Sequence, residues 1–511
     1  MEPSIITEVS EERAGRDLRA SNCSADWRYT EGVVKIVLIS TYELGRQPFG
    51  LVSPAAWLRA AGHDVTCLDL TRQELNNTTI GAAEAIAIYL PMHTATRLAA
   101  KLIPILREKN PAARICCYGL YAPMNAEYLL SLGVEKLIGG EFELELVRWA
   151  SSPDANGALQ SVVSLERLTF QLPDRAGLPP IQQYAHVVLP EGGYRIVGST
   201  EASRGCKHLC RHCPIVPVYK GAFRIVARNV VMEDVRRQIA AGAQHISFGD
   251  PDFFNGIGHA VPLIEEFYRE FPGVTYDVTI KIEHLRKHET LLPKLRDTGC
   301  LFVISAAESV DDEILGKLDK GHKRADFLHV TRRFRELAIT LHPTFVPFTP
   351  WTTMEGYLDL LQVLQEEELI ENVAPVQLGI RLLIPEGSRL LELKEMRKIV
   401  GPFDAESLVY PWTSPDARLD ALSAKVQEIA AASDAARWPR TKTFSAILHA
   451  AHDAAGLPAP HLESKTGRAV PFLSEPWYCC AEPTKDQLIS LGVPPVKNPS
   501  AAVAASAESF V

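Results

Sequence analysis

Three cysteines within eight residues constrain this chain more than any other feature. Cys206, Cys210 and Cys213 lie in the stretch SRGCKHLCRHCP, which occupies residues 203–214. Thiols at this CxxxCxxC spacing reach a common point only from a short, well-held loop. The apolar run at residues 197–200 predicts a buried strand that delivers this loop at its carboxyl end, where β/α barrels place their chemistry.

The three thiols suit two kinds of metal group. Three thiolates can bind three irons of a [4Fe–4S] cube, and the fourth iron is then open to a small molecule. Zinc is the alternative, because it takes four Cys or His ligands and His208 or His212 is close enough in sequence to complete such a set. The motif alone leaves both open.

The segment before this loop alternates between short apolar runs and helical patterns. Continuous apolar runs rich in β-branched residues are typical of buried parallel strands. The alternation predicts a doubly wound parallel sheet over residues 33–150. The predicted strands are 33–40, 65–70, 85–90, 114–118 and 136–138, and the predicted helices are 51–61, 94–109 and 125–132.

A second β/α series follows the cysteine loop, with about thirty residues in each unit. It predicts a partial (β/α)6 barrel over residues 195–400, so the fold class is α/β throughout this part. The predicted strands are 197–200, 245–248, 276–282, 301–305, 339–345 and 376–384, and the predicted helices are 231–241 and 291–298.

The remaining segments are predicted to be less regular. Residues 1–32 are polar and predict a flexible leader, residues 151–194 a linker, and residues 497–511, rich in Ala and Ser, a flexible tail. Residues 401–496 predict a helical extension with helices at 414–437 and 443–455. Ser414 is expected to cap the first of these helices, since a proline follows it.

Composition restricts the class of protein. A net charge of -9 without a Lys/Arg-rich run argues against a general nucleic-acid binder. No apolar run is long enough to span a bilayer, and the N-terminus lacks an apolar signal core. The ten cysteines are irregularly spaced, unlike a secreted disulfide framework, so we expect a reducing, cytoplasmic compartment.

Several motifs in a fixed order resemble the radical S-adenosylmethionine (SAM) superfamily. These are GGEFE at residues 139–143, the cysteine loop, the acidic turn GDPD at 249–252, the stretch 299–321 and PEGS at 385–388. The resemblance covers residues 33–391. It implies a [4Fe–4S] cluster on Cys206, Cys210 and Cys213, SAM as co-substrate, a cobalamin-binding-type N-terminal domain, a small-molecule substrate, and a reductant such as flavodoxin or ferredoxin.

The N-terminal domain departs from the family in one place. Some relatives carry Asp-x-His-x-x-Gly, whose histidine binds cobalt, but here residues 43–50 are ELGRQPFG. The resemblance therefore leaves two alternatives. The domain either binds cobalamin without this histidine, or it is a vestigial docking domain that has lost cobalamin binding.

The resemblance also implies residues that seat SAM. The turn Gly249, Asp250 and Asp252 offers carboxylates for the SAM ammonium group, which needs such a partner once water is excluded. Glu308 would contact the ribose or the substrate, and His212 stands where relatives place an aromatic side chain near the adenine. An ordinary Asp-rich turn and a helix-capping Glu308 are the alternatives.

Adjacent cysteines close the helical extension. Cys479 and Cys480 belong to the sequence PWYCCAEP and resemble the radical SAM group named for its CCAEP tail. Adjacent thiols suit a soft acceptor such as trivalent arsenic, a second metal, or a strained disulfide. We expect them to be catalytic residues that handle the substrate, with a pair of incidental thiols as the alternative.

Three functions follow. The first is transfer of the 3-amino-3-carboxypropyl group of SAM to a soft acceptor such as trivalent arsenic, as in arsinothricin-type biosynthesis. The alternative is cobalamin-dependent radical methylation of an unactivated carbon in a natural product. A hypothesis of another class is a non-catalytic metal or cobalamin sensor. The first two predict a transferase.

Overall fold

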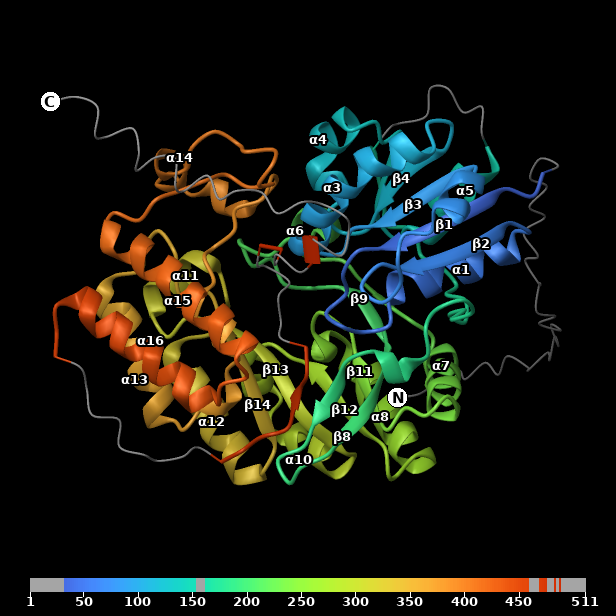
Figure 1. Cartoon of the computed structure of the whole chain (residues 1–511). Coiled ribbons are helices and arrows are strands. Elements are labelled where there is room, and N and C mark those ends of the chain that lie inside the picture. Colours follow the sequence, from blue (N-terminus) through green and yellow to red (C-terminus); the bar gives the residue numbers. More distant parts are fainter. Residues whose placement is uncertain (1–31, 153–160, 459–467, 476–481, 484–486, 489–511) are drawn as a thin grey trace, which may run out of the picture.

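A computed structural model describes residues 32–152, 161–458, 468–475, 482–483 and 487–488 of the chain. Figure 1 shows two α/β parts, the first (blue to cyan) lying above the second (green to yellow), with the C-terminal helices (orange) packed at one side. The predicted α/β fold class is confirmed. Nearly all of the predicted leader, and the whole predicted tail, lie outside the described residues.

The first part is a six-stranded, all-parallel sheet in the order β2-β1-β3-β4-β5-β6. Its strands are apolar and buried because helices cover both faces. The elements are β1 (Lys35–Ser40), α1 (Phe49–Ala60), β2 (Asp64–Asp69), α2 (Asn77–Ala82), β3 (Ala85–Tyr89), α3 (His93–Lys109), β4 (Arg114–Tyr118), η1 (Pro123–Asn125), α4 (Ala126–Ser131), β5 (Lys136–Gly140), α5 (Glu143–Ser151) and β6 (Ser161–Ser164).

Two separate apolar cores hold this sheet. Helices α1 and α5 pack on one face through Leu51, Leu58 and Leu146. Helix α3 packs on the opposite face, together with residues of α2 and α4. The helix pattern of the sequence therefore matches a doubly wound sheet, as predicted.

The second part is a curled, seven-stranded sheet in the order β14-β13-β12-β11-β8-β7-β15. The five strands from β14 to β8 are parallel, and β7 and β15 run antiparallel at one edge. The strands are β7 (His186–Val188), β8 (Tyr194–Thr200), β11 (His245–Phe248), β12 (Thr275–Thr279), β13 (Cys300–Glu308), β14 (Thr340–Phe345) and β15 (Phe472–Leu473).

Helices cover the convex side of this half-barrel and share one large core with it. The other elements of this part are η2 (Ile181–Gln183), β9 (Ser203–Gly205), α6 (Ile215–Tyr219), β10 (Phe223–Ile225), α7 (Arg228–Ala240), η3 (Phe253–Gly256), α8 (Ile257–Glu270), α9 (Ile282–Lys287), η4 (Glu289–Leu291), α10 (Leu292–Asp297), α11 (Asp312–Leu318), α12 (Arg324–Leu337) and α13 (Met354–Glu366).

Residues 151–194, expected as a linker, supply a strand to each sheet. Strand β6 pairs with β5 in the first sheet, and β7 pairs with β8 in the second. The segment thus passes from one sheet directly into the other.

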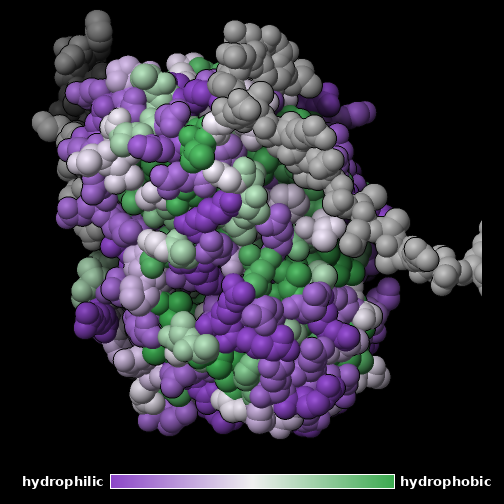
Figure 2. Space-filling view, turned by 90° about the vertical axis from the view of Figure 1, so that its right-hand side faces the viewer, coloured by the Kyte–Doolittle hydropathy of each residue, from purple (hydrophilic) through white to green (hydrophobic). Residues whose placement is uncertain are grey.

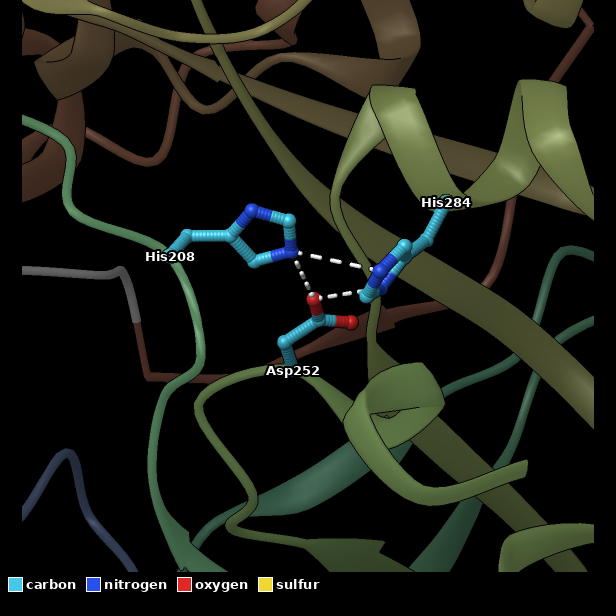
Figure 3. Close-up of side chains that lie close together, drawn as sticks. All are labelled: His208, Asp252 and His284. Carbon is cyan, nitrogen blue, oxygen red and sulfur yellow. Dashed lines mark hydrogen bonds and ion pairs between the residues drawn. The ribbon is translucent and has the colours of Figure 1, made fainter. Parts of the chain in front are cut away.

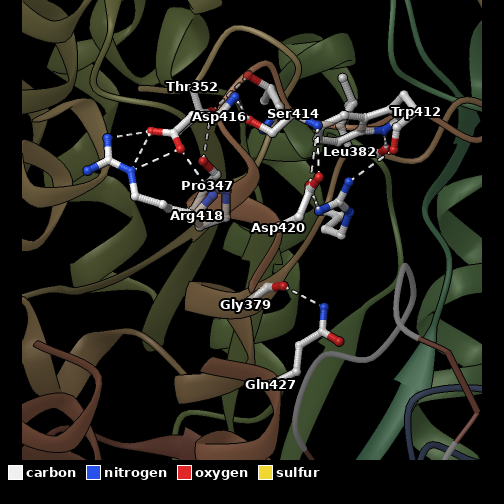
Figure 4. A network of polar contacts seen from close by, with 12 residues as sticks. Pro347, Thr352, Gly379, Leu382, Trp412, Ser414, Asp416, Arg418, Asp420 and Gln427 are labelled. Carbon is white, nitrogen blue, oxygen red and sulfur yellow. Dashed lines mark hydrogen bonds and ion pairs between the residues drawn. The ribbon is translucent and has the colours of Figure 1, made fainter. Parts of the chain in front are cut away.

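The predicted sixth barrel strand at residues 376–384 does not form. The segment instead contains the 3-10 helix η6 (Pro375–Gly379) and one isolated parallel bridge between Phe348 and Arg381. Two backbone carbonyl oxygens of this segment accept hydrogen bonds from side chains. Gln427 Nε2 donates to Gly379 O at 2.9 Å (Figure 4), and the Tyr357 hydroxyl donates to Leu378 O at 3.0 Å. These groups are not available for a strand ladder.

The C-terminal helices replace that strand at the side of the half-barrel. The last elements are η5 (Ile370–Asn372), η7 (Arg389–Glu392), α14 (Met396–Ile399), α15 (Ala417–Ala435) and α16 (Arg440–Ala455). Residues Leu422 and Phe444 of α15 and α16 belong to the same core as the half-barrel. The cap of α15 is Asp416 and not Ser414, because the Asp416 carboxylate accepts the Arg418 N–H at 3.0 Å, whereas the Ser414 hydroxyl accepts the Asp416 N–H at 3.3 Å (Figure 4).

The surface of the protein carries both hydrophilic and hydrophobic residues. Figure 2 shows a mainly hydrophilic face with hydrophobic residues gathered around its middle. None of the helices in the described ranges is long and apolar enough to cross a lipid bilayer.

Candidate active site

A cavity of about 450 Å³ lies where the carboxyl ends of the two parallel sheets meet. From the first sheet come residues at or just after the ends of β1, β3, β4 and β5, and from the second sheet come residues at or just after the ends of β8, β11, β12, β13 and β14. Parallel sheets bind ligands at this edge. Its lining includes Leu44, Arg46, Tyr89, Met92, Leu120, Tyr121, Gly140, Glu201, His212, Cys213, Gly249, Asp250, Thr279, Glu308 and Phe345.

The cysteine loop runs between β9 and α6. Cys206 and Cys210 are buried, and Cys213 lines the cavity. The loop starts at Gly205, whose backbone is left-handed with φ 72°. A Cβ there would lie 2.5 Å from Ala222 O and from a ring carbon of Tyr219, so only glycine fits.

Two thiols of this loop have raised pKa values because they are buried. Burial, with the neighbouring Cys210, raises the pKa of Cys213 to about 12. Burial also raises the pKa of Cys206. Without a nearby positive charge Cys206 and Cys213 stay protonated, unlike a reactive cysteine with a lowered pKa.

The spacing of the thiols fits an iron–sulfur cube better than zinc. Zinc bonds of about 2.3 Å place tetrahedral thiolates about 3.8 Å apart. Within the described residues, one set of three His, Cys, Asp or Glu side chains has ligand atoms within 4.8 Å of one another, and that set does not include the three cysteines. At least one pair of the three sulfur atoms is therefore more than 4.8 Å apart, and this separation suits an iron–sulfur cube better than a single zinc ion.

Both histidines of the loop pair with carboxylates. His208 Nε2 lies 3.5 Å from Asp252 Oδ2, and His208 Nδ1 lies 3.4 Å from Glu283 Oε2. His212 Nε2 lies 3.1 Å from Glu308 Oε1. These pairings weaken the alternative of a zinc site completed by a histidine of the loop.

The PEGS stretch at residues 385–388 holds the loop from outside. Ser388 Oγ donates to Arg211 O at 3.2 Å, and Arg389 Nη1 donates to Leu209 O at 2.6 Å. The Arg211 guanidinium in turn donates to Lys317 O at 3.0 Å, at the end of α11. Backbone carbonyls of the loop are thus fixed by groups far away in the sequence.

Glu308 forms a buried charge cluster at the cavity wall. Its carboxylate lies 3.3 Å from Lys320 Nζ as well as 3.1 Å from His212. Burial raises the pKa of Glu308, but Lys320 and His212 outweigh it and lower that pKa to about 2. Glu308 therefore presents a permanent negative charge beside Cys213.

The residues of the acidic turn after β11 do not all face the cavity. Gly249 and Asp250 line the cavity. The Asp250 carboxylate accepts hydrogen bonds from Ala202 N at 2.9 Å and from the Ser203 hydroxyl, so it holds the start of the cysteine loop. Burial raises the pKa of Asp250 to about 7. Asp252 does not line the cavity.

Arg204 is a site residue that the sequence analysis missed. Its guanidinium lies 2.7 Å from Glu143 and 3.4 Å from Glu141, both in the GGEFE motif of the first part, and 2.6 Å from Glu201 of the second. All of these side chains are largely buried. The motif was recognised, but its partner is distant in sequence and no local pattern identifies it.

The β1–α1 loop, where some relatives place a cobalt-binding histidine, contributes Leu44 and Arg46 to the cavity. Glu43 beside them is half-buried and accepts the Phe49 N–H at 3.2 Å. Burial, with the nearby Glu201 carboxylate, raises the pKa of Glu43 to about 8. This loop offers no imidazole to the cavity.

Cys479 and Cys480 lie outside the described residues. Glu482, two positions after Cys480, is described: its carboxylate lies 3.1 Å from His93 and 3.0 Å from Arg97, both on α3. Met92, which precedes His93, lines the cavity. Glu482 itself is therefore held near the cavity.

Two curated proteins resemble this chain. The hopanoid C-3 methylase of Methylococcus capsulatus is 22% identical over 320 residues, which cover 60% of this chain and 62% of the methylase. The ribosomal protein uS12 methylthiotransferase RimO of Syntrophotalea carbinolica is 24% identical over 181 residues, covering 32% and 38% respectively. The chain thus matches less than two thirds of each relative. No protein-family model matches it.

Two solved structures share the fold. OxsB, a cobalamin-dependent SAM radical enzyme solved with aqua-cobalamin and SAM bound, superimposes with a TM-score of 0.63 at 14% identity, covering 78% of this chain and 67% of OxsB. The radical SAM methyltransferase TsrM from Kitasatospora setae, solved with cobalamin and a [4Fe–4S] cluster, gives a TM-score of 0.53 at 16% identity, covering 66% and 74%.

These similarities agree with the resemblance found in the sequence. The chain has the fold of the radical SAM enzymes that carry an N-terminal cobalamin-binding-type domain.

Proposed function

We propose that this protein is a radical SAM methyltransferase that uses cobalamin to methylate an unactivated carbon of a small molecule. The observation that carries the proposal is the cavity at the junction of the two sheets. Its wall joins Met92, Leu120 and Tyr121 of the cobalamin-type part to Cys213 and Glu308 of the barrel. One cavity thus adjoins both cofactor regions.

The residues present fit these cofactors. Cys206, Cys210 and Cys213 would hold three irons of a [4Fe–4S] cluster. When bound, the cluster supplies the electron that cleaves SAM, and cobalamin supplies the methyl group. The proposal rests on the hopanoid methylase and the two solved enzymes, which favour it over transfer of an aminocarboxypropyl group to arsenic.

The chain's own residues prepare the cavity. Glu308, held ionised by Lys320 and His212, offers a carboxylate for a cationic group of SAM or for the ribose hydroxyls. Asp250 fixes the backbone at the start of the cysteine loop. In this proposal Asp252 acts elsewhere, because it does not line the cavity.

The substrate would approach through a second cavity. It measures about 700 Å³ and shares Ile304, Thr344 and Gln377 with the first. His342 and Arg440 also line it, so it accepts a small molecule with polar as well as apolar parts. We further propose that Cys479 and Cys480 act on this substrate, since Glu482 anchors the nearby chain to α3.

Cobalt content tests the cobalamin part. The reconstituted protein should retain about one cobalamin per chain after desalting. Leu120→Trp fills the cavity beside the first sheet, so we expect cobalt to fall at least tenfold while iron is unchanged. Leu130→Trp is the matched control, because Leu130 packs on the same core but does not line the cavity. Equal cobalt loss in both variants, or no cobalt in either, would reject cobalamin binding in this cavity.

A further inference from the structure

Three side chains outside the cavity converge from three separate elements. His208 lies in the cysteine loop, Asp252 precedes η3, and His284 lies on α9. Figure 3 shows the two imidazoles and the carboxylate pointing toward one another. None of the three lines the cavity described above, so the proposed reaction leaves them without a role.

The ligand atoms lie at metal-site spacing. Asp252 Oδ2 is 2.7 Å from His284 Nδ1 and 3.5 Å from His208 Nε2, and the two Nε2 atoms are 3.2 Å apart. Zinc bonds of about 2.0–2.1 Å place tetrahedral ligand atoms about 3.3 Å apart. The two short distances involve different nitrogens of His284, and each of the three side chains offers a ligand atom within 4.8 Å of the others.

Two of the polar atoms at this point lack a hydrogen bond. Asp252 Oδ2 and His284 Nδ1 are buried and form none, although they lie 2.7 Å apart. The Asp252 side chain is 0% exposed. A buried carboxylate oxygen that faces two imidazoles needs a positive charge there, which a metal ion or a protonated imidazole supplies.

His208 and Asp252 also contact groups outside the site, in the way that metal ligands usually do. His208 turns its second ring nitrogen, Nδ1, to the Glu283 carboxylate at 3.4 Å. The second oxygen of Asp252 accepts the Phe254 N–H at 3.3 Å. Ligating histidines and carboxylates are usually oriented by such partners. The nearest ammonium, Lys281, is paired with Glu283 at 3.0 Å.

We propose that His208, Asp252 and His284 bind one zinc ion, separate from the iron–sulfur cluster. Two imidazoles and one carboxylate suit zinc, and water would complete the four-coordinate set. The ion ties the cysteine loop to the turn after β11 and to α9. This site therefore holds the outer side of the loop whose cysteines hold the cluster.

Metal content of the full chain tests the site. Cys206, Cys210 and Cys213 are all replaced by Ser, so that the cysteine loop holds neither iron nor zinc. The protein is incubated with Zn²⁺ alone, desalted, and analysed by elemental mass spectrometry. We expect about one zinc per chain, and a loss of at least tenfold in zinc affinity when His284→Ala is added. His288→Ala, one turn further along, should retain the zinc.

A second variant guards against loss of folding. Asp252→Asn keeps the oxygen that accepts the Phe254 N–H but removes the charge, so the turn is preserved and zinc affinity should fall at least tenfold. Glu283→Gln should weaken binding by about 10–100-fold, as outer partners do. Circular dichroism confirms that each variant is folded.

Two results would overturn the proposal. One is a triple-serine protein that binds no zinc, or that binds Fe²⁺ but not zinc in a parallel anaerobic incubation. The other is equal zinc in the His284→Ala and His288→Ala proteins. Because this protein carries no cluster, the result does not depend on whether the proposed methyl transfer is correct.

Discussion

Glu308 illustrates how single residues set the chemistry of the cavity. It ends β13 with a left-handed backbone, φ 68°, which places its carboxylate between Lys320 and His212. A non-glycine residue in this conformation is strained and is often found at functional sites. The family resemblance pointed to Glu308, but Lys320 belongs to a stretch recognised only as a motif.

Replacing Glu308 tests this charge cluster by its pH dependence. Because the folded-state pKa, about 2, lies below the ordinary 4.5, Glu308 stabilises the fold above pH 4.5, by about 3 kcal/mol, and this contribution is lost as the pH falls toward 2. Glu308→Gln should therefore lower the urea midpoint at pH 7 and approach the wild type near pH 3.

The double variant Glu308→Gln/Lys320→Met supplies the control. Removing both charges leaves no buried ammonium without a partner, so it should cost less than Glu308→Gln alone. A deficit of Glu308→Gln that is the same at pH 7 and pH 3 would contradict the assignment.

At the scale of elements, local pattern and tertiary context decide different things. Strands such as β4 (Arg114–Tyr118) and β11 (His245–Phe248) were predicted at their observed bounds, because each is a short run within the regular β/α alternation. Residues 376–384 are equally apolar but do not form a strand. Their backbone groups bond to side chains of α13 and α15, and no local signal reveals such partners.

The cysteine loop is the element on which the chemistry depends, and Gly205 determines its start. In Gly205→Ala the new Cβ would clash with the Ala222 carbonyl at 2.5 Å. We expect iron and acid-labile sulfide after reconstitution to fall severalfold. Gly221→Ala is the matched control: its φ is also positive, 85°, but its nearest neighbour is a flexible Leu209 side chain at 3.3 Å. Equal iron in the two variants would show that the loop does not need Gly205.

At the scale of the whole molecule, one buried arginine joins the two sheets. Arg204 precedes the cysteine loop and binds Glu141 and Glu143 of the first part. The sequence predicted both sheets separately, with the GGEFE motif at the end of the first. It could not predict how they dock, because a long-range ion pair leaves no periodic pattern.

Arg204→Met should uncouple the two parts. It leaves buried carboxylates without their cation, which costs about 3–5 kcal/mol. Calorimetry of the full chain should show a lower first unfolding transition that separates from the second. Arg148→Met is the control, because the half-exposed Arg148 pairs with Glu145 and Glu166 at the surface and contributes less than about 1 kcal/mol. An unchanged thermogram for Arg204→Met would refute this role.

Only part of the cofactor site could be predicted from the sequence. Cys206, Cys210 and Cys213 form a local motif, and strand order alone places them at the barrel mouth. Asp252 was predicted beside SAM from its position in the acidic turn. The structure places its carboxylate beside His208 and His284, outside the cavity, and its role beside SAM stays a prediction.

The product of SAM cleavage tests the central claim most directly. The protein is reconstituted with iron, sulfide and cobalamin without oxygen, supplied with SAM and dithionite, and its products are identified by mass spectrometry. We predict 5′-deoxyadenosine from the wild type and none from Cys213→Ala. Methylthioadenosine in its place would contradict methyl transfer and favour the aminocarboxypropyl reaction, and no cleavage with zinc bound at the three cysteines would contradict the assignment as a radical SAM enzyme.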